Sequence, residues 1–239
     1  MVDDSVDDMY YGCSEAMMES VKQDKFKEMT RGKFAEKWRV SKDCVKKMEN
    51  QIKPKALTQE HLKALCIYTG NEIYGEFNRA VRTSRSSYGS SFKFHTLHFW
   101  LTSALQILND NCSCQITYRR THDTFVGDKY QTFRFGSFAS TSTLTNLTNF
   151  GKETCFKIKT CYGASVQEFS VIRPNEMEVL IPPYEMFEIK EIIKGEDKVK
   201  KHFKVQSCKL MYVVESAGIK SNLNCKAVPK VPMVLHSSG

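Results

Sequence analysis

The amino-acid sequence predicts an α+β fold, in which a helical N-terminal half packs on a mostly antiparallel β-sandwich core. Apolar residues recur at helical spacing through residues 1–112, as an amphipathic helix requires. Short β-prone runs separated by turn residues fill residues 113–226, which is typical of antiparallel strands. No Gly-x-Gly-x-x-Gly sequence or P-loop indicates a parallel nucleotide-binding sheet. We therefore expect one compact unit of two packed halves, followed by a tail at residues 227–239.

Four helices are predicted in the N-terminal half, at residues 13–29, 58–70, 74–82 and 94–108. Thr58 is a candidate N-cap for the second helix, and Gly70 is its stop signal. The fourth helix has the strongest apolar stripe. Its members are Leu97, Trp100, Leu101, Ala104, Leu105 and Leu108. His95 and His98 flank this stripe, and we interpret both as structural rather than catalytic.

The C-terminal half is expected to be all-β. Its predicted strands are residues 115–118, 131–135, 154–160, 168–172, 178–181, 186–189 and 209–214. After the second of these, Ser140, Thr141 and Ser142 form a hydroxyl-rich stretch that we predict to be a turn at the end of a strand.

Composition indicates a soluble globular protein, with 41% hydrophobic and 26% charged residues. The net charge is +8, but basic and acidic residues alternate along the chain, so we expect a solvated surface and no nucleic-acid partner. No apolar run approaches the roughly 20 residues of a transmembrane helix. The N-terminal aspartates do not fit a signal peptide. Because residues 233–239 resemble an appended tag, we expect that targeting segments are missing from both ends.

The nine cysteines indicate an oxidising, secretory setting rather than a metal site. No Cys-x-x-Cys pair is present, so we expect neither a zinc cluster nor another metal centre. Two glycosylation sequons, at residues 111–113 and 146–148, favour the same setting. The odd number of cysteines leaves at least one of them free or in an intermolecular bond.

Three elements of the C-terminal half could carry chemistry. Arg119 ends a strand and offers a permanently charged fork suited to phosphate. Ser140 and its neighbours could hold a carboxylate or a ribose. Glu176 and Glu178 lie two residues apart, so on a strand both side chains point to the same face. Each element also has a plain structural interpretation, respectively a surface ion pair, a capped turn and an exposed edge strand.

Taken in order, these elements resemble the Arg–Ser–Glu-x-Glu constellation of the vertebrate arginine-specific ecto-mono-ADP-ribosyltransferases. The resemblance covers roughly residues 5–226 and includes the sequence around each element. The segments that carry it are residues 7–13, 94–102, 134–140, 160–164 and 178–185. It implies the fold of that family, a single compact catalytic unit, and transfer of ADP-ribose from NAD⁺ to protein arginine.

The resemblance also implies a role for each residue. Arg119 would bind the NAD⁺ pyrophosphate, and Ser140 would orient Glu178. Glu178 would bind the nicotinamide ribose and stabilise an oxocarbenium-like transition state. Glu176 would position the acceptor guanidinium and take its proton as the new bond forms, because arginine is fully protonated beforehand.

Further implied contacts come from Arg120, Thr141, Ser142 and Phe150. Residues 143–150 would cover the phosphates and nicotinamide, and residues 163–175 would recognise the acceptor protein. Phe150 would either stack on nicotinamide or belong to the core. Many relatives have glycine where this chain has Arg120, so the arginine side chain must point away from the nucleotide.

The family pattern further implies disulfides Cys13–Cys225 and Cys114–Cys161, with Cys112 as a competitor of Cys114. The first would close a very long loop, contributing about 4–5 kcal/mol in the chain-entropy model. The family pattern leaves Cys44, Cys66, Cys155 and Cys208 unassigned.

Two alternative functions remain open. The same Arg119, Ser140 and Glu178 would serve an NAD⁺ glycohydrolase, in which water replaces arginine. A non-enzymatic extracellular binding module on the same scaffold is the other. For the leading hypothesis we expect NAD⁺ and proteins with exposed arginines as partners, a monomer, and a location that is secreted or lipid-anchored at the cell surface.

Overall fold

The computed structural model describes residues 3–30, 32–51, 56–70, 72–109, 113–170, 174–205 and 207–228. In this part of the chain, six α-helices precede the first strand: α1 (Ser14–Lys22), α2 (Lys33–Val40), α3 (Lys42–Gln51), α4 (Gln59–Thr69), α5 (Tyr74–Thr83) and α6 (His95–Leu108). The start of α4 agrees with its predicted cap, since the backbone N–H of Thr58 donates to Nδ1 of His61 at 3.0 Å. No helix in the described ranges is both long and apolar enough to cross a bilayer.

The strands of the described residues form one mixed sheet in the order β2-β7-β8-β4-β1-β3-β6-β5. Their bounds are β1 (Gln115–Thr121), β2 (Thr132–Phe133), β3 (Ala139–Ser142), β4 (Thr154–Thr160), β5 (Ala164–Ser165), β6 (Glu178–Ile181), β7 (Glu185–Lys194) and β8 (Leu210–Ile219). Neighbouring strands are antiparallel except β4 and β8, which are parallel. The predicted α+β class with a mostly antiparallel sheet is therefore confirmed.

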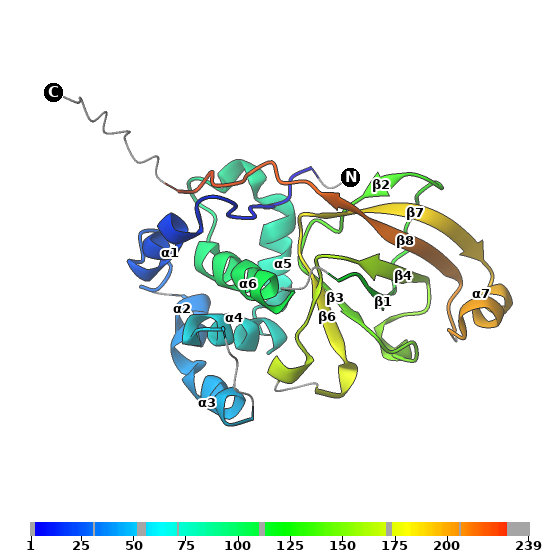
Figure 1. The fold of residues 1–239 in the computed structure, drawn as a ribbon, viewed down its shortest axis with the longest axis horizontal. Coiled ribbons are helices and arrows are strands. Elements are labelled where there is room, and N and C mark those ends of the chain that lie inside the picture. The colour runs from blue at the N-terminus through cyan, green and yellow to red at the C-terminus, as the bar shows by residue number, and fades with distance from the viewer. Residues whose placement is uncertain are drawn as a thin grey trace.

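The sheet twists enough to enclose a core of its own. In Figure 1, β3 and β6 run steeply across the direction of β7 and β8. Side chains from both parts of the sheet pack in one buried cluster, including Ala139 and Ile181 from one part and Phe187 and Val214 from the other. This is the packing expected of a sandwich-like core.

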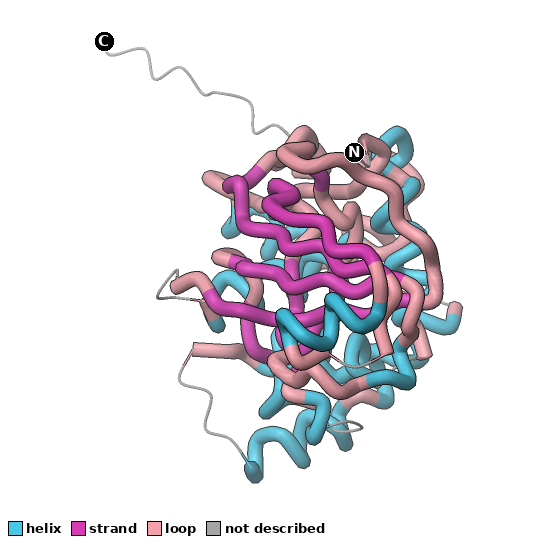
Figure 2. The backbone as a smooth tube through the Cα atoms, turned by 90° about the vertical axis from the view of Figure 1, so that its right-hand side faces the viewer, coloured by secondary structure: helices cyan, strands magenta, loops and turns pink. Residues whose placement is uncertain are grey.

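The opposite face of β6 packs against the helices. Leu180 belongs to the large buried cluster of the N-terminal helices, whereas its neighbour Ile181 belongs to the cluster inside the sheet, as the alternation of a strand requires. Figure 2 shows most helices gathered behind and below the strands. The helical half and the sheet therefore meet along β6.

Several predicted elements differ from the structure. The first helix ends at Lys22 rather than residue 29. There Asp24 has a φ of 48°, and its carboxylate accepts the N–H of Glu28 at 2.8 Å, as in a turn. In place of the strand predicted at residues 168–172, a 3₁₀ helix spans Gln167–Phe169, and residues 171–172 lie outside the described ranges.

Three helices in charged segments were not predicted. The sequence gives α2 and α3 weak stripes, in which few side chains such as Phe34 and Met48 are buried. The third, α7 (Glu196–Phe203), lies within the half expected to be all-β, and that expectation is wrong. Its acids lie in the first turn and Lys200 and Lys201 in the last, as the helix dipole favours. Val199 is a fully buried apolar side chain that belongs to the same cluster as Met211 of β8.

Four disulfides connect the described residues. Cys13 is bonded to Cys225 and Cys114 to Cys161, the two pairings that the resemblance implies. The unassigned cysteines form Cys44–Cys66 and Cys155–Cys208. Cys112 lies outside the described residues. Four bridges in one chain of this size fit a protein of an oxidising compartment.

The N-terminal segment is fixed to the end of the chain by a buried ion pair as well as by the Cys13–Cys225 bridge. The guanidinium of Arg134 contacts the carboxylate of Asp7, and both side chains are fully buried. The same carboxylate accepts the N–H of Asn222 at 2.9 Å and of Leu223 at 3.0 Å. Residues about 215 positions apart therefore share one hydrogen-bonded site.

His95 and His98 are buried and do not line the cavity described below, and their interpretation as structural residues stays a prediction. Nδ1 of His98 accepts the Tyr10 hydroxyl at 2.7 Å, and its Nε2 lies 3.1 Å from the carbonyl oxygen of Val6. Burial lowers the pKa of His98 to about 3. His95 contacts the buried carboxylate of Glu28 at 3.0 Å.

The low pKa of His98 predicts a pH-dependent loss of stability. The unfolded chain protonates this histidine near pH 6.5, whereas the folded protein does so only near pH 3. The contribution of neutral His98 to the free energy of unfolding is therefore complete above about pH 6.5. Below that pH it falls by up to about 1.4 kcal/mol per pH unit. Urea unfolding between pH 4.5 and 7 should show a flatter pH dependence for His98→Gln than for the unchanged protein.

The pH slopes of two variants must be compared because Asp8 and Glu185 change the stability with pH in the opposite direction to His98. Burial raises the pKa of both carboxyls. The matched control is His202→Gln at an exposed site. Equal slopes for His98→Gln and the unchanged protein would contradict the prediction.

Candidate functional site

A cavity of about 490 Å³ opens where β1, β3 and β6 face the ends of α4 and α5. The strands β1 and β3 are paired through Tyr118 and Ser142. These two residues line the cavity together with their neighbours Arg119 and Thr141. All eight residues predicted for catalysis or NAD⁺ binding are among its lining residues. They are Arg119, Arg120, Ser140, Thr141, Ser142, Phe150, Glu176 and Glu178.

The hydroxyl-rich stretch forms strand β3, so the prediction of a turn there is wrong. Its residues pair with β6, with Ser140 opposite Leu180 and Ser142 opposite Glu178. Opposite residues of an antiparallel pair share a face, so both serines face the same side as Glu178. Thr141 points to the other face, where its hydroxyl donates to Val179 O at 2.6 Å. β-Strand pairing, which sequence alone did not reveal, places the hydroxyls beside the carboxylate.

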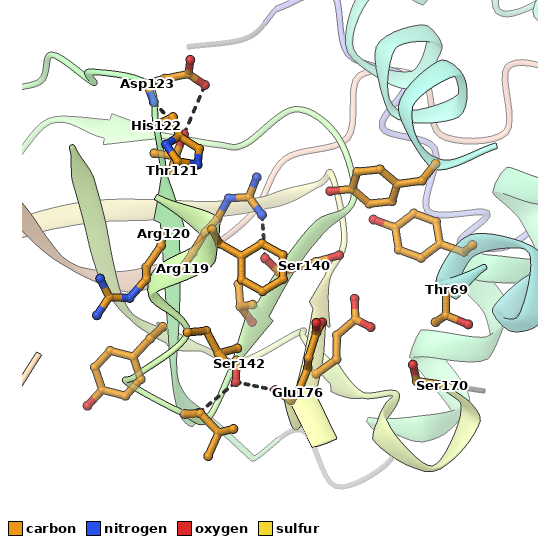
Figure 3. A pocket seen from close by; sticks show the side chains of 18 residues that line it. Thr69, Arg119, Arg120, Thr121, His122, Asp123, Ser140, Ser142, Ser170 and Glu176 are labelled. Carbon is orange, nitrogen blue, oxygen red and sulfur yellow. Dashed lines mark hydrogen bonds between the residues drawn. The ribbon is translucent and has the colours of Figure 1, made fainter. Parts of the chain in front are cut away.

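Arg119 is positioned by the backbone of β3. Its Nη1 donates to the carbonyl oxygen of Ser140 at 2.6 Å, and its guanidinium lies over the ring of Phe135 at 5.9 Å. Figure 3 shows the Arg119 side chain directed toward Ser140 at the cavity wall. The side chain is partly buried, so its positive charge is available to an anion in the cavity and is only weakly screened by solvent.

Glu176 and Glu178 reach the cavity in a different way from the one predicted. Only Glu178 lies on a strand, because Glu176 ends the short 3₁₀ helix Pro174–Glu176. Between them Met177 has a φ of 49°, a left-handed conformation that non-glycine residues adopt at a cost. The Ser142 hydroxyl donates to Glu176 O at 2.5 Å, and the N–H of Thr143 donates to Met177 O at 3.2 Å. These contacts fix the turn between two glutamates that both line the cavity, and Figure 3 shows Glu176 at the cavity wall.

The Arg120 side chain points away from the carboxylates, as the resemblance requires. In Figure 3 its guanidinium lies on the opposite side of β1 from Ser140 and Glu176. The residue is buried, and this burial lowers the pKa of the guanidinium below its usual value.

The helical half contributes two tyrosines that the sequence did not single out. Tyr68 and Tyr74 line the cavity opposite the strands. The Tyr68 hydroxyl donates to Phe138 O at 3.1 Å and is hydrogen-bonded to the Ser140 side chain. Burial above all raises the pKa of Tyr68, which keeps the hydroxyl protonated. The only local sign in the sequence is their place at the two ends of a helix break, around Gly70.

The remaining predicted residues are also placed at the cavity. Phe150 lines it from the end of the 3₁₀ helix Thr148–Phe150, and its stacking role stays a prediction. Asn146 of the second sequon is exposed on the same loop, whereas Asn111 of the first lies outside the described residues. Among the residues that the structure describes, no three His, Cys, Asp or Glu side chains are grouped as metal ligands.

Known proteins are similar to this chain both in sequence and in fold. The family model described as NAD:arginine ADP-ribosyltransferase matches residues 1–209. A Gallus gallus protein, NAD(P)(+)--arginine ADP-ribosyltransferase 2, is 35% identical over 208 residues, which are 83% of this chain and 66% of that protein. Ecto-ADP-ribosyltransferase 5 of Bos taurus is 36% identical over 240 residues, 93% of this chain and 72% of its own length. The chain thus spans about two thirds of the length of these relatives.

Among solved structures, the eukaryotic mono-ADP-ribosyltransferase ART2.2 is similar along almost the whole chain. A glutamate-to-alanine mutant of it in complex with NADH has a TM-score of 0.77 and 30% identity, covering 94% of this chain and 96% of that one. A family model that matches most of the sequence, together with this fold, shows that the chain belongs to the NAD:arginine ADP-ribosyltransferase family.

Proposed function

We propose that the protein transfers ADP-ribose from NAD⁺ to arginine side chains of other proteins and releases nicotinamide. The observation that carries this proposal is the meeting of Arg119, Ser140, Glu176 and Glu178 at one cavity. The names of its relatives, which include arginine ADP-ribosyltransferases, and the NADH complex of a similar fold support it. Because the cavity is lined from both halves, we further propose that residues 1–226 act as one catalytic unit.

The proposed reaction begins with a bound dinucleotide. Arg119 pairs with the pyrophosphate by charge-assisted hydrogen bonds. Glu178 accepts a hydrogen bond from a ribose hydroxyl and stabilises the positive charge that develops as the bond to nicotinamide breaks. Ser140, whose hydroxyl is hydrogen-bonded to Tyr68 in this structure, is proposed to turn its hydroxyl hydrogen to the Glu178 carboxylate when NAD⁺ binds and so keep Glu178 in place. Ser142 completes the wall on which the nucleotide lies, and Thr141, whose side chain points to the other face, contributes its backbone.

Glu176 is proposed to select arginine as the acceptor. Its carboxylate attracts the guanidinium and orients one nitrogen toward the anomeric carbon. As the carbon–nitrogen bond forms, the guanidinium loses a proton, which Glu176 takes. Without Glu176, water can still reach the same carbon, so hydrolysis of NAD⁺ would continue.

Glu176→Gln is therefore expected to separate the two reactions. Transfer of labelled ADP-ribose to agmatine should fall at least about tenfold, whereas release of free ADP-ribose should change by less than about threefold, since Arg119, Ser140 and Glu178 are intact. A single assay with labelled NAD⁺ measures both products.

The matched control is Glu191→Gln, at an exposed residue of β7, which should leave both products unchanged. Equal losses of transfer and hydrolysis in Glu176→Gln would contradict the role of Glu176. If the unchanged protein makes only free ADP-ribose, the glycohydrolase alternative is correct. If it neither binds nor consumes NAD⁺, the alternative of a non-enzymatic binding module is correct.

We also propose that the protein acts outside the cell, as a secreted or lipid-anchored monomer. The four disulfides among the described residues and the ecto-enzyme names of its relatives support an extracellular location. Its acceptors would be proteins with exposed arginines, approached through residues 163–175, of which 171–173 lie outside the described ranges.

A further inference from the structure

The guanidinium of Arg120 is enclosed by backbone carbonyls behind the cavity wall. Its Nη2 donates to Thr145 O at 2.7 Å. Its Nη1 lies 3.5 Å from the carbonyl oxygens of both Gly151 and Ser207. Removing a guanidinium from water is costly unless such acceptors replace the lost hydration, so the side chain and the carbonyls stabilise each other's positions.

Two of these carbonyls belong to residues 143–151, the first part of the connection between β3 and β4, which we call the loop 143–151. This loop supplies Leu144, Leu147 and Phe150 to the cavity. Its start is fixed by the bond from Thr143 N to Met177 O. Its end lies against β1, because a side chain at Gly151 would meet the Thr121 carbonyl carbon at 2.1 Å. Thr145 lies between these two points, where Arg120 provides a charged contact.

The third carbonyl belongs to a part of the chain that is held covalently. Ser207 precedes Cys208, which is bonded to Cys155 on β4, and Nη1 of Arg120 lies 3.8 Å from Sγ of Cys155. Arg120 therefore connects the loop 143–151 to the strand pair β4 and β8. This cross-linked strand pair is a rigid support for the loop.

We propose that Arg120 is a positioning residue for NAD⁺, which fixes the loop 143–151 so that its apolar side chains keep their place on the cavity wall. The inference rests on the proposed function. The side chain acts through the loop and not by touching the substrate, so its loss should weaken NAD⁺ binding and leave the chemical step largely intact.

The test compares Arg120→Met, which keeps the side-chain volume but cannot donate, with Arg120→Lys, which keeps the charge. For Arg120→Met the KM for NAD⁺ should rise about tenfold with kcat changed less than about threefold, and Arg120→Lys should recover most of that loss. The matched control is Arg79→Met on the exposed side of α5, for which neither constant should change.

Hydrogen–deuterium exchange provides a second measurement that does not need activity. Residues 143–151 should exchange slowly in the unchanged protein and faster in Arg120→Met, while α6 should exchange equally in both. The inference is overturned if Arg120→Met keeps the original KM and the original exchange of this loop. It is also overturned if the loop of the unchanged protein already exchanges as fast as the exposed residues around Val126.

Failure of this inference differs from failure of the proposed function. Unchanged protein that does not consume NAD⁺ would contradict the proposed function, and the exchange comparison would still decide whether Arg120 fixes the loop. Active protein whose Arg120→Met variant behaves like Arg79→Met would contradict the inference alone.

Discussion

Replacing Glu178 with glutamine is expected to lower NAD⁺ turnover by about 10²–10³-fold, the usual effect of removing one preorganised electrostatic group from a transition state. Glutamine has nearly the same shape and can still accept a hydrogen bond. It lacks the negative charge that opposes the positive charge developing on the ribose. The loss should therefore appear in kcat for both transfer and hydrolysis, whereas the KM for NAD⁺ should change little because Arg119 is intact.

The measurement is the initial rate of nicotinamide release at saturating NAD⁺, with and without agmatine. Glu191→Gln, at an exposed position of β7, is the matched control and should keep full activity. If Glu178→Gln still consumes NAD⁺ at a rate within threefold of the unchanged protein, Glu178 does not have the catalytic role proposed for it.

The second large effect is expected from Asp7→Asn, far from the cavity. The change leaves the fully buried guanidinium of Arg134 without the charge of its partner, and such losses cost about 3–5 kcal/mol. The asparagine oxygen can still accept the N–H groups of Asn222 and Leu223, but its NH₂ then faces the guanidinium, so the change removes both the charge and the acceptor of Arg134. For a chain of this size the expected decrease in Tm is roughly 10 °C.

Thermal and urea unfolding with the disulfides intact would measure this loss. Asp4→Asn, at an exposed neighbouring position, should change the free energy of unfolding by less than about 0.5 kcal/mol. A loss below about 1 kcal/mol for Asp7→Asn would mean that water or other groups compensate the guanidinium.

The sequence predicts much of the fold because periodicity is a local property. The stripe on α6 and the cap at Thr58 depend on residues within one or two turns, and both helices are found where expected. In contrast, α7 buries few side chains, so its composition resembles that of an exposed loop. Whether such a charged segment forms a helix is decided by tertiary packing, which is not visible in the local sequence.

In the candidate site, too, local features of the sequence could be predicted and contacts between distant residues could not. The types and order of Arg119, Ser140, Glu176 and Glu178 are visible in the sequence, and the resemblance makes their combination specific. Their geometry depends on partners distant in the chain, so the strand at Ser140 and the left-handed turn at Met177 could not be predicted. The two tyrosines were missed because they lie on the other half of the molecule, with no motif around them.

The bridge between Cys13 and Cys225 makes the polypeptide a covalent ring, since it spans 212 positions. A single peptide-bond cleavage anywhere inside that ring would leave both fragments attached to one another. The exposed stretch around Val126 separates Arg119 from Glu178 along the backbone. A protein nicked there would therefore retain both halves of its cavity in one molecule, which is of value to a protein exposed to proteases.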